Sequence, residues 1–175
     1  MKQKIRQIKL ILFDVDGVLC SGDTSYLDDG REFKTFDVQD GFGVTMARLA
    51  GLKTGILTGR QSKAIERRAK ELKVDILSQG NFNKLVPYQE IKKRFALDDQ
   101  EICFIGDDLL DLSVLERVGF SVAVPNAREE VKAVCDYITV ARGGRGAVRE
   151  VIDLILKRQN KFTDLLDSLP DIKQP

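Results

Sequence analysis

Short apolar segments alternate with longer amphipathic ones along most of this chain, a pattern typical of α/β proteins. The apolar segments have the length of strands, and the longer ones place apolar residues on one helical face. The expected strands are 9–13, 53–57, 74–77, 102–105, 121–124 and 137–140, and the expected helices are 43–50, 62–72, 85–95, 109–118 and 147–158. Because helices separate successive strands, we expect a Rossmann-like three-layer α/β sandwich with a mainly parallel sheet.

The segment between the first strand and the first helix follows a different pattern. Residues 20–37 are mostly polar, and Asp28-Asp29-Gly30 at their centre suits a hairpin turn with aromatic residues on both sides. We therefore expect a β-hairpin that projects as a flap after the first strand.

The length of 175 residues has room for one core, which we place at residues 1–158. A large inserted cap domain is not expected in a chain of this size. Residues 159–175 are polar and include Pro170 and Pro175, which predicts a loosely held C-terminal tail.

The composition excludes several kinds of chemistry. The chain has no histidine, which removes Ser-His-Asp and Cys-His catalysis and His-ligated zinc, and leaves proton transfer to carboxylates, lysine, tyrosine or cysteine. The net charge of +1 gives no field for nucleic acid or an anionic membrane, so neither is expected as a partner. Cys20, Cys103 and Cys135 form no C-x-x-C pair, and no leader pattern or long apolar run is present, which favours a cytoplasmic protein.

Acidic residues follow the first expected strand directly. Asp14 and Asp16 lie in the turn Asp14-Val15-Asp16-Gly17, at the carboxyl edge of the expected sheet, where open α/β folds bind their ligands. An Asp- and Gly-rich turn is also ordinary loop chemistry, so this motif is weak evidence by itself.

The next two strands are followed by groups that can hold a phosphate. Thr58 and Gly59 end the strand 53–57 and offer a hydroxyl and a flexible backbone N–H. Lys84 begins a helix after the third strand, where its ammonium could neutralise charge on a transferring group. The ordinary alternatives are a threonine that caps a helix and a solvated surface lysine.

The fourth strand ends in Gly106-Asp107-Asp108, with Asp111 one turn later. Their oxygens suit a hard divalent cation that also meets Asp14, although an acidic turn at a helix start is common without one. Four such features at four successive strand ends are much less probable by chance than any one. Together they predict a phosphoryl-transfer site.

These motifs resemble those of the haloacid dehalogenase superfamily. Within it, residues 8–157 are similar to one family, the 3-deoxy-D-manno-octulosonate 8-phosphate phosphatases, in the capless type. The stretches that carry this resemblance are Phe13-Asp14-Val15-Asp16-Gly17-Val18-Leu19, Asp40-Gly41-Phe42-Gly43, Asn83-Lys84-Leu85 and Gly143-Gly144-Arg145-Gly146-Ala147-Val148-Arg149-Glu150. The resemblance implies a phosphatase of lipopolysaccharide precursor synthesis.

The resemblance also implies the roles of individual residues. Asp14 would attack phosphorus and form an aspartyl-phosphate, while Asp16 would protonate the leaving alkoxide and then take a proton from water. The cofactor would be Mg²⁺, held by Asp14, Asp107 and the backbone carbonyl of Asp16. Thr58 and Lys84 would hold the phosphoryl oxygens.

Other residues would act around this centre. Asp108 and Asp111 are expected to support the metal ligands. Substrate-binding candidates are Gly59 and Arg60 beside the phosphate site, with Arg145 and Arg149, which could fold over it to meet the carboxylate of a sugar acid.

The resemblance implies a homotetramer as well, in which the hairpin covers a neighbour's site. One departure concerns Gln39, since the family usually has arginine before Asp40-Gly41, and this bears on the exact sugar. The alternatives left open are a phosphatase of a sialic or ketodeoxynononate 9-phosphate, a phospho-accepting receiver module, and a non-catalytic domain of the same fold.

Overall fold

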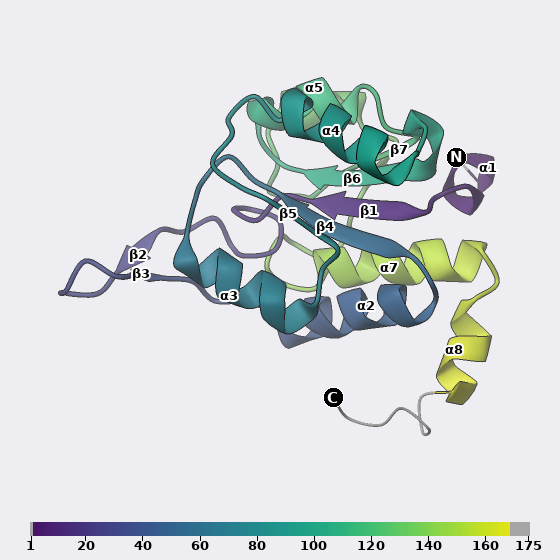
Figure 1. The fold of residues 1–175 in the computed structure, drawn as a ribbon, viewed down its shortest axis with the longest axis horizontal. Helices are drawn as coiled ribbons and strands as arrows, with labels where there is room; N and C mark the ends of the chain where they lie inside the picture. Colours follow the sequence, from purple (N-terminus) through teal and green to yellow (C-terminus); the bar gives the residue numbers. More distant parts are fainter. Residues whose placement is uncertain (1, 169–175) are drawn as a thin grey trace.

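A six-stranded sheet forms the centre of the computed structural model, which describes residues 2–168. The strand order is β5-β4-β1-β6-β7-β8, and each of these pairings is parallel. The strands are β1 (Leu10–Phe13), β4 (Lys53–Leu57), β5 (Ile76–Ser78), β6 (Ile102–Gly106), β7 (Phe120–Ala123) and β8 (Tyr137–Ile138). Figure 1 shows α2, α3 and α7 on one face of the sheet and α4 and α5 on the other, which confirms the expected three-layer α/β sandwich.

The helices are α1 (Lys2–Arg6), α2 (Val38–Leu49), α3 (Lys63–Leu72), α4 (Leu85–Phe95), α5 (Leu112–Leu115), α6 (Glu129–Val134), α7 (Ala147–Arg158) and α8 (Phe162–Ser168), with 3₁₀ turns η1 (Asp99–Glu101) and η2 (Leu109–Asp111). Helices α3, α4 and α7 lie within one residue of their expected bounds. The single helix expected at 109–118 is wrong, because this segment is η2 followed by the short α5. Helices α1, α6 and α8 were not expected.

Strand β1 lies at the middle of the sheet and positions the site. Leu10 is in register with Lys53 of β4 on one side and with Ile102 of β6 on the other. All four residues of β1 are buried, because helices cover both faces of a parallel sheet. The carboxyl ends of β1, β4 and β6 therefore meet at one edge.

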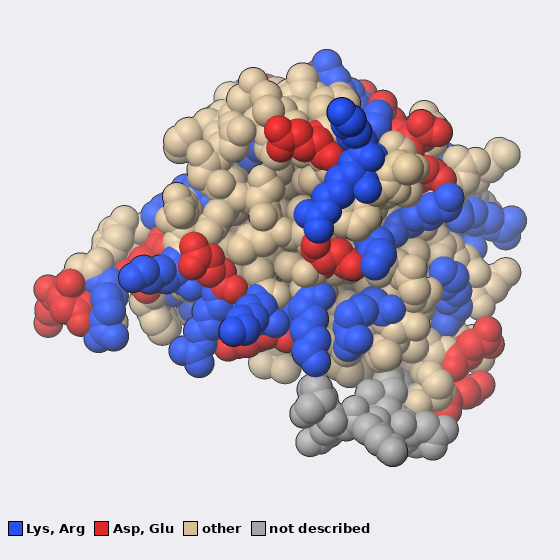
Figure 2. All heavy atoms as spheres, viewed as in Figure 1, with Lys and Arg blue, Asp and Glu red and all other residues tan. Residues whose placement is uncertain are grey.

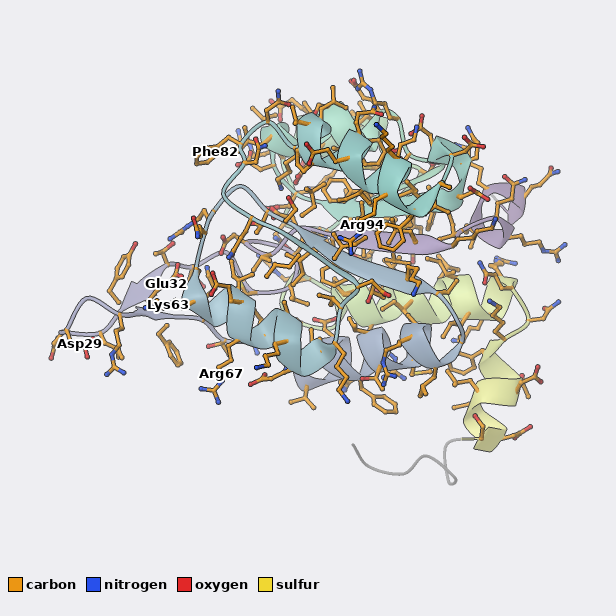
Figure 3. All side chains as sticks on the ribbon, viewed as in Figure 1. Asp29, Glu32, Lys63, Arg67, Phe82 and Arg94 are labelled. Atoms are coloured by element: carbon orange, nitrogen blue, oxygen red, sulfur yellow. The ribbon has the colours of Figure 1, made fainter. Side chains whose placement is uncertain are left out.

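The predicted hairpin is present. Strands β2 (Ser25–Tyr26) and β3 (Glu32–Phe33) form a separate antiparallel pair that projects from the edge where β1 ends (Figure 1). Its tip carries Asp29, labelled in Figure 3, and the aromatic rings of Tyr26 and Phe33 are 64% and 56% exposed. Among residues 2–168 the structure shows this flap and no large cap domain.

The face in Figure 2 carries charges of both signs. Lys and Arg side chains gather along α3, where Figure 3 labels Lys63 and Arg67, with acidic groups between them and at the hairpin tip. None of the helices within residues 2–168 combines the length and the apolar character needed to cross a bilayer.

The segment assigned to the tail begins with ordered structure. The side chain of Gln159 donates hydrogen bonds to the carbonyl oxygens of Ile5 (3.3 Å) and Ile8 (2.7 Å), and Leu165 of α8 is buried. Residues 169–175 of the predicted tail lie outside the described residues.

Candidate active site

A cavity of ≈ 470 Å³ lies at the carboxyl ends of β1, β4 and β6. It brings together eight of the residues that the sequence singles out, from four separate strand ends. The lining residues are Asp14, Asp16, Gly17, Ser21, Gly22, Asp23, Thr58, Gly59, Arg60, Phe82, Lys84, Asp107, Asp108, Leu110 and Asn126.

The turn after β1 is held tightly against β6. The backbone N–H of Asp14 donates to the carbonyl of Ile105 at 3.0 Å, which extends the parallel ladder by one residue. Gly17 has a φ of +85°, and a Cβ at this position would lie 2.0 Å from Asp107 Oδ2. Glycine is therefore required both by the backbone conformation and by the approach of the Asp107 carboxylate.

Lys84 is buried between two carboxylates, with 2% of the residue exposed. Its Nζ lies 3.0 Å from Asp14 Oδ2 and 2.5 Å from Asp111 Oδ1. Burial alone would lower the pKa of Lys84, but the charges of Asp14 and Asp111 outweigh it and raise this pKa above its ordinary value. The lysine is therefore a fixed positive charge inside the cavity.

Three carboxylates, those of Asp14, Asp107 and Asp111, each place an oxygen within 4.8 Å of the others. Burial and the charges of Asp14 and Asp111 raise the pKa of Asp107 to about 8. Burial also raises the pKa of Asp14 to about 6, against the lowering effect of Lys84. Asp14 Oδ1 and Asp107 Oδ1 are buried and have no hydrogen-bond partner among residues 2–168. Two orphaned carboxylate oxygens in one crowded anionic pocket fit a divalent cation.

Asp111, the third carboxylate of this cluster, holds Lys84 and the loop after β6 in place. It is fully buried, and one of its oxygens accepts from Lys84. The other accepts from the backbone N–H groups of Asp107 (2.9 Å) and Asp108 (3.3 Å). Since both oxygens are engaged, Asp111 shapes the loop after β6, and the side chain of Asp108 caps η2 by accepting from Leu109 N–H at 2.7 Å.

Thr58 and Gly59 lie where β4 ends, as expected. Thr58 is 2% exposed, and its N–H donates to the carbonyl of Ser78 at 2.9 Å. The ring of Phe82 lies against Gly59, so that a Cβ on residue 59 would be 3.1 Å from Phe82 Cδ1. Figure 3 shows Phe82 at the same end of the molecule as the hairpin, pointing outward.

Arg60 lines the cavity and also fastens the hairpin. Its guanidinium donates to Thr24 Oγ1 and to Glu32 Oε1, both at 2.8 Å. Arg145 is exposed and, like Arg149, is absent from the residues that line the cavity. Arg149 instead forms an ion pair with Asp153 at 2.8 Å.

The family-specific stretches meet each other behind the site. Asp40 is fully buried and accepts from the N–H groups of Gly146 (3.1 Å) and Arg149 (2.8 Å), so it caps the start of α7 from another helix. Gln39, beside it, donates its N–H to Asp37 Oδ1 at 2.7 Å within the first turn of α2 and does not line the cavity.

Asn126 and Lys34 were missed by sequence reasoning. Asn126 donates to the carbonyl of Gly17 at 2.8 Å and accepts from the N–H of Gly143 at 2.9 Å, so it ties the turn after β1 to the loop before α7. It follows β7 by three residues, and the rule that active groups follow strand ends could have found it. Lys34 forms an ion pair with Asp16; the only signal for it is its alternation with Glu32 along the hairpin.

Comparisons with known proteins agree with this geometry. Residues 74–152 match the family model of haloacid dehalogenase-like hydrolases. The chain is 40% identical over 161 residues to the 3-deoxy-D-manno-octulosonate 8-phosphate phosphatase of Escherichia coli K12, which covers 92% of this chain and 86% of that protein.

Solved structures are similar over nearly the whole chain. The 3-deoxy-D-manno-octulosonate 8-phosphate phosphatase of Moraxella catarrhalis, in complex with magnesium, phosphate and KDO, has a TM-score of 0.93 and 43% identity, over 95% of this chain and 96% of that chain. The cobalt-bound deoxy-D-mannose-octulosonate 8-phosphate phosphatase of Haemophilus influenzae has a TM-score of 0.88 and 35% identity, over 92% and 94%.

Proposed function

The chain belongs to the 3-deoxy-D-manno-octulosonate 8-phosphate phosphatase family, and from that premise we propose that it hydrolyses this sugar acid phosphate to the free sugar acid and phosphate. It is a phosphoric monoester hydrolase of the haloacid dehalogenase-like type, and the reaction is a step of lipopolysaccharide precursor synthesis. The observation that carries the proposal is the cavity in which Asp14, Lys84 and Asp107 converge.

Asp14 is the proposed nucleophile. It is positioned by the β1–β6 ladder, and the ammonium of Lys84 at 3.0 Å favours its ionised form. Attack on phosphorus forms an aspartyl-phosphate and releases the sugar alkoxide. Lys84 and the Thr58 hydroxyl hold the phosphoryl oxygens while negative charge develops on them.

Mg²⁺ is the cofactor, and Asp14, Asp107 and the backbone carbonyl of Asp16 would hold it. When bound, it supplies the positive charge that offsets repulsion between the carboxylates and the phosphate. The two orphaned oxygens, Asp14 Oδ1 and Asp107 Oδ1, support this assignment. Asp108 and Asp111 support these ligands by ordering the loop after β6.

Asp16 carries the proton in this proposal. It protonates the departing sugar oxygen and later takes a proton from the water that attacks the aspartyl-phosphate. The absence of histidine leaves it few competitors, and it lines the same cavity as Asp14.

The sugar acid is proposed to bind at the mouth of the cavity. Gly59 and Arg60 lie there, and the Arg60 guanidinium could exchange its contact with Glu32 for the substrate carboxylate. Arg145 and Arg149 lie outside the lining of this chain's own cavity, so a contact with substrate requires movement or a second copy.

A homotetramer is part of the proposal. The exposed rings of Tyr26 and Phe33 on the hairpin, together with Phe82 (65% exposed) and Leu110 (45%) at the cavity mouth, form apolar surfaces that a neighbour's hairpin could cover. A native-mass measurement tests this, and a monomer would refute it.

We also place the reaction in the cytoplasm, where Cys20, Cys103 and Cys135 stay reduced thiols.

The decisive experiment compares turnover of 3-deoxy-D-manno-octulosonate 8-phosphate with sialic and ketodeoxynononate 9-phosphates and with simple sugar phosphates, in Mg²⁺. Preference for the first supports the proposal, and equal turnover of the panel refutes the narrow substrate. The variant Asp14→Asn should lose activity by several orders of magnitude. Activity that persists in Asp14→Asn would refute the nucleophile.

A further inference from the structure

A buried lysine of the hairpin contacts the proton-carrying carboxylate of the proposed reaction. The side chain of Lys34 is 1% exposed, although it belongs to a projecting element. Its Nζ forms an ion pair with Asp16 Oδ1 and lies 3.3 Å from Glu32 Oε1. A buried ammonium needs such partners, and of these two Asp16 belongs to the proposed catalytic residues.

The contact places the two carboxylate oxygens of Asp16 in different hydrogen-bonding environments. Oδ1 accepts from Lys34, and the Sγ of Cys20 lies at 3.5 Å from the same oxygen. Oδ2 is buried and has no hydrogen-bond partner among residues 2–168. A carboxylate gripped through one oxygen has its rotation about Cβ–Cγ restricted, which leaves the other oxygen available to a reacting group.

We infer that Lys34 is a positioning residue: by holding Asp16 Oδ1, it presents Oδ2 to the sugar oxygen that leaves phosphorus. Lys34 does not line the cavity and so acts through Asp16. Glu32, which forms ion pairs with both Lys34 and Arg60, fixes the lysine in turn. This inference rests on the proposed phosphatase function and assigns the hairpin a role within its own chain's site.

The test uses leaving groups that differ in their need for a proton. A sugar alkoxide must be protonated as it leaves, whereas p-nitrophenolate leaves readily without a proton. The constant kcat/KM covers steps through leaving-group departure, so later hydrolysis of the aspartyl-phosphate does not enter it. In Lys34→Met we expect kcat/KM for the sugar acid phosphate to fall about 100-fold, and for p-nitrophenyl phosphate by less than about 5-fold.

Two measurements separate positioning from other roles. The inhibition constant of inorganic phosphate should stay within about 2-fold, since Lys34 is not a lining residue. The control Arg31→Met removes an equal charge from the same hairpin, at an exposed pair with Asp29, and should change neither substrate's kcat/KM. Should Lys34→Met fold poorly, Lys34→Gln keeps a donor and should show the same selectivity with a smaller loss.

Equal loss for both substrates, or weaker phosphate binding in parallel, would overturn the inference, because either result means that Lys34 serves the fold or the phosphate. Wild-type protein that fails to hydrolyse the sugar acid phosphate would instead refute the proposed function.

Discussion

Replacing Lys84 by methionine tests whether the charge balance of the site also stabilises the fold. The change keeps most of the side-chain volume but leaves Asp14, Asp107 and Asp111 without their buried cation. Removing one partner of a buried ion pair costs about 3–5 kcal/mol, because the remaining charge is uncompensated. For an m-value of about 2.5 kcal/mol per M, a loss of about 4 kcal/mol lowers the urea midpoint by roughly 1.6 M.

The assay is urea unfolding of metal-free protein, followed by the same titration in Mg²⁺. We expect Mg²⁺ to raise the midpoint more in Lys84→Met than in wild type, because it replaces the missing positive charge. The matched control is Lys9→Met, which breaks an exposed pair with Glu101 (2.5 Å, with Lys9 65% exposed) and should cost no more than about 1 kcal/mol. A loss in Lys84→Met no larger than in the control would refute the reasoning.

Three further predictions concern two supports of the site and one surface ion pair. In urea titrations, Asp40→Ala should lower the free energy of unfolding by about 3 kcal/mol and Asp40→Asn by about 1 kcal/mol, because Asn keeps one acceptor for the N–H groups at the start of α7. Equal losses in the two variants would contradict this. Gly143→Ala should abolish turnover and lower the melting temperature, because its Cβ would lie 1.6 Å from the Gly17 carbonyl oxygen; an active, stable variant would disprove the close approach. Burial favours the neutral acid of Asp136, but Lys4 outweighs it and holds the pKa of Asp136 below its usual value. Because the pKa of Asp136 is lower in the folded protein than in the unfolded chain, wild type should be more stable than Asp136→Asn by about 1 kcal/mol above pH ~4 and should lose that advantage as the pH falls further. An advantage that does not depend on pH would contradict this.

The strand ends were predictable because their signal is local. Strand β4 matches its expected bounds, and β1 and β6 differ from theirs by one residue, since each is a short apolar run bounded by glycine, polar or charged residues. In a parallel sheet, local strand ends also imply spatial neighbours, which is why Asp14, Thr58 and Asp107 could be grouped before their distances were known.

Features that depend on distant partners were not predictable in this way. Helix α2 begins five residues before the expected start, because Gly41 and Gly43 weaken its helical signal. The glycine at position 43 allows α7 to pack closely against α2, since a Cβ there would lie 3.0 Å from Arg149 Cδ of α7. The place of Asn126 after β7 was open to prediction, but its contact with Gly17 across 109 residues of sequence was not, because no local pattern reports such a contact.

The short helices were missed for a related reason. Helix α1 has five residues and α8 has seven, lengths at which isolated helices are not stable in water. Tertiary contacts maintain them, because only 0% of Ile5 in α1 and 7% of Leu165 in α8 is exposed to solvent. Their stability comes from packing, which a periodicity argument does not measure.

The central place of β1 in the sheet has a consequence for the order in which the protein can fold. Leu10 pairs with Lys53 and Ile102, so β1, the earliest strand of this sheet in the sequence, must wait until both later strands exist. A chain interrupted before β6 has the proposed nucleophile Asp14 but neither the neighbouring strand that aligns it nor Asp107. The capacity for chemistry should therefore arise only after β6 has been synthesised and has paired with β1.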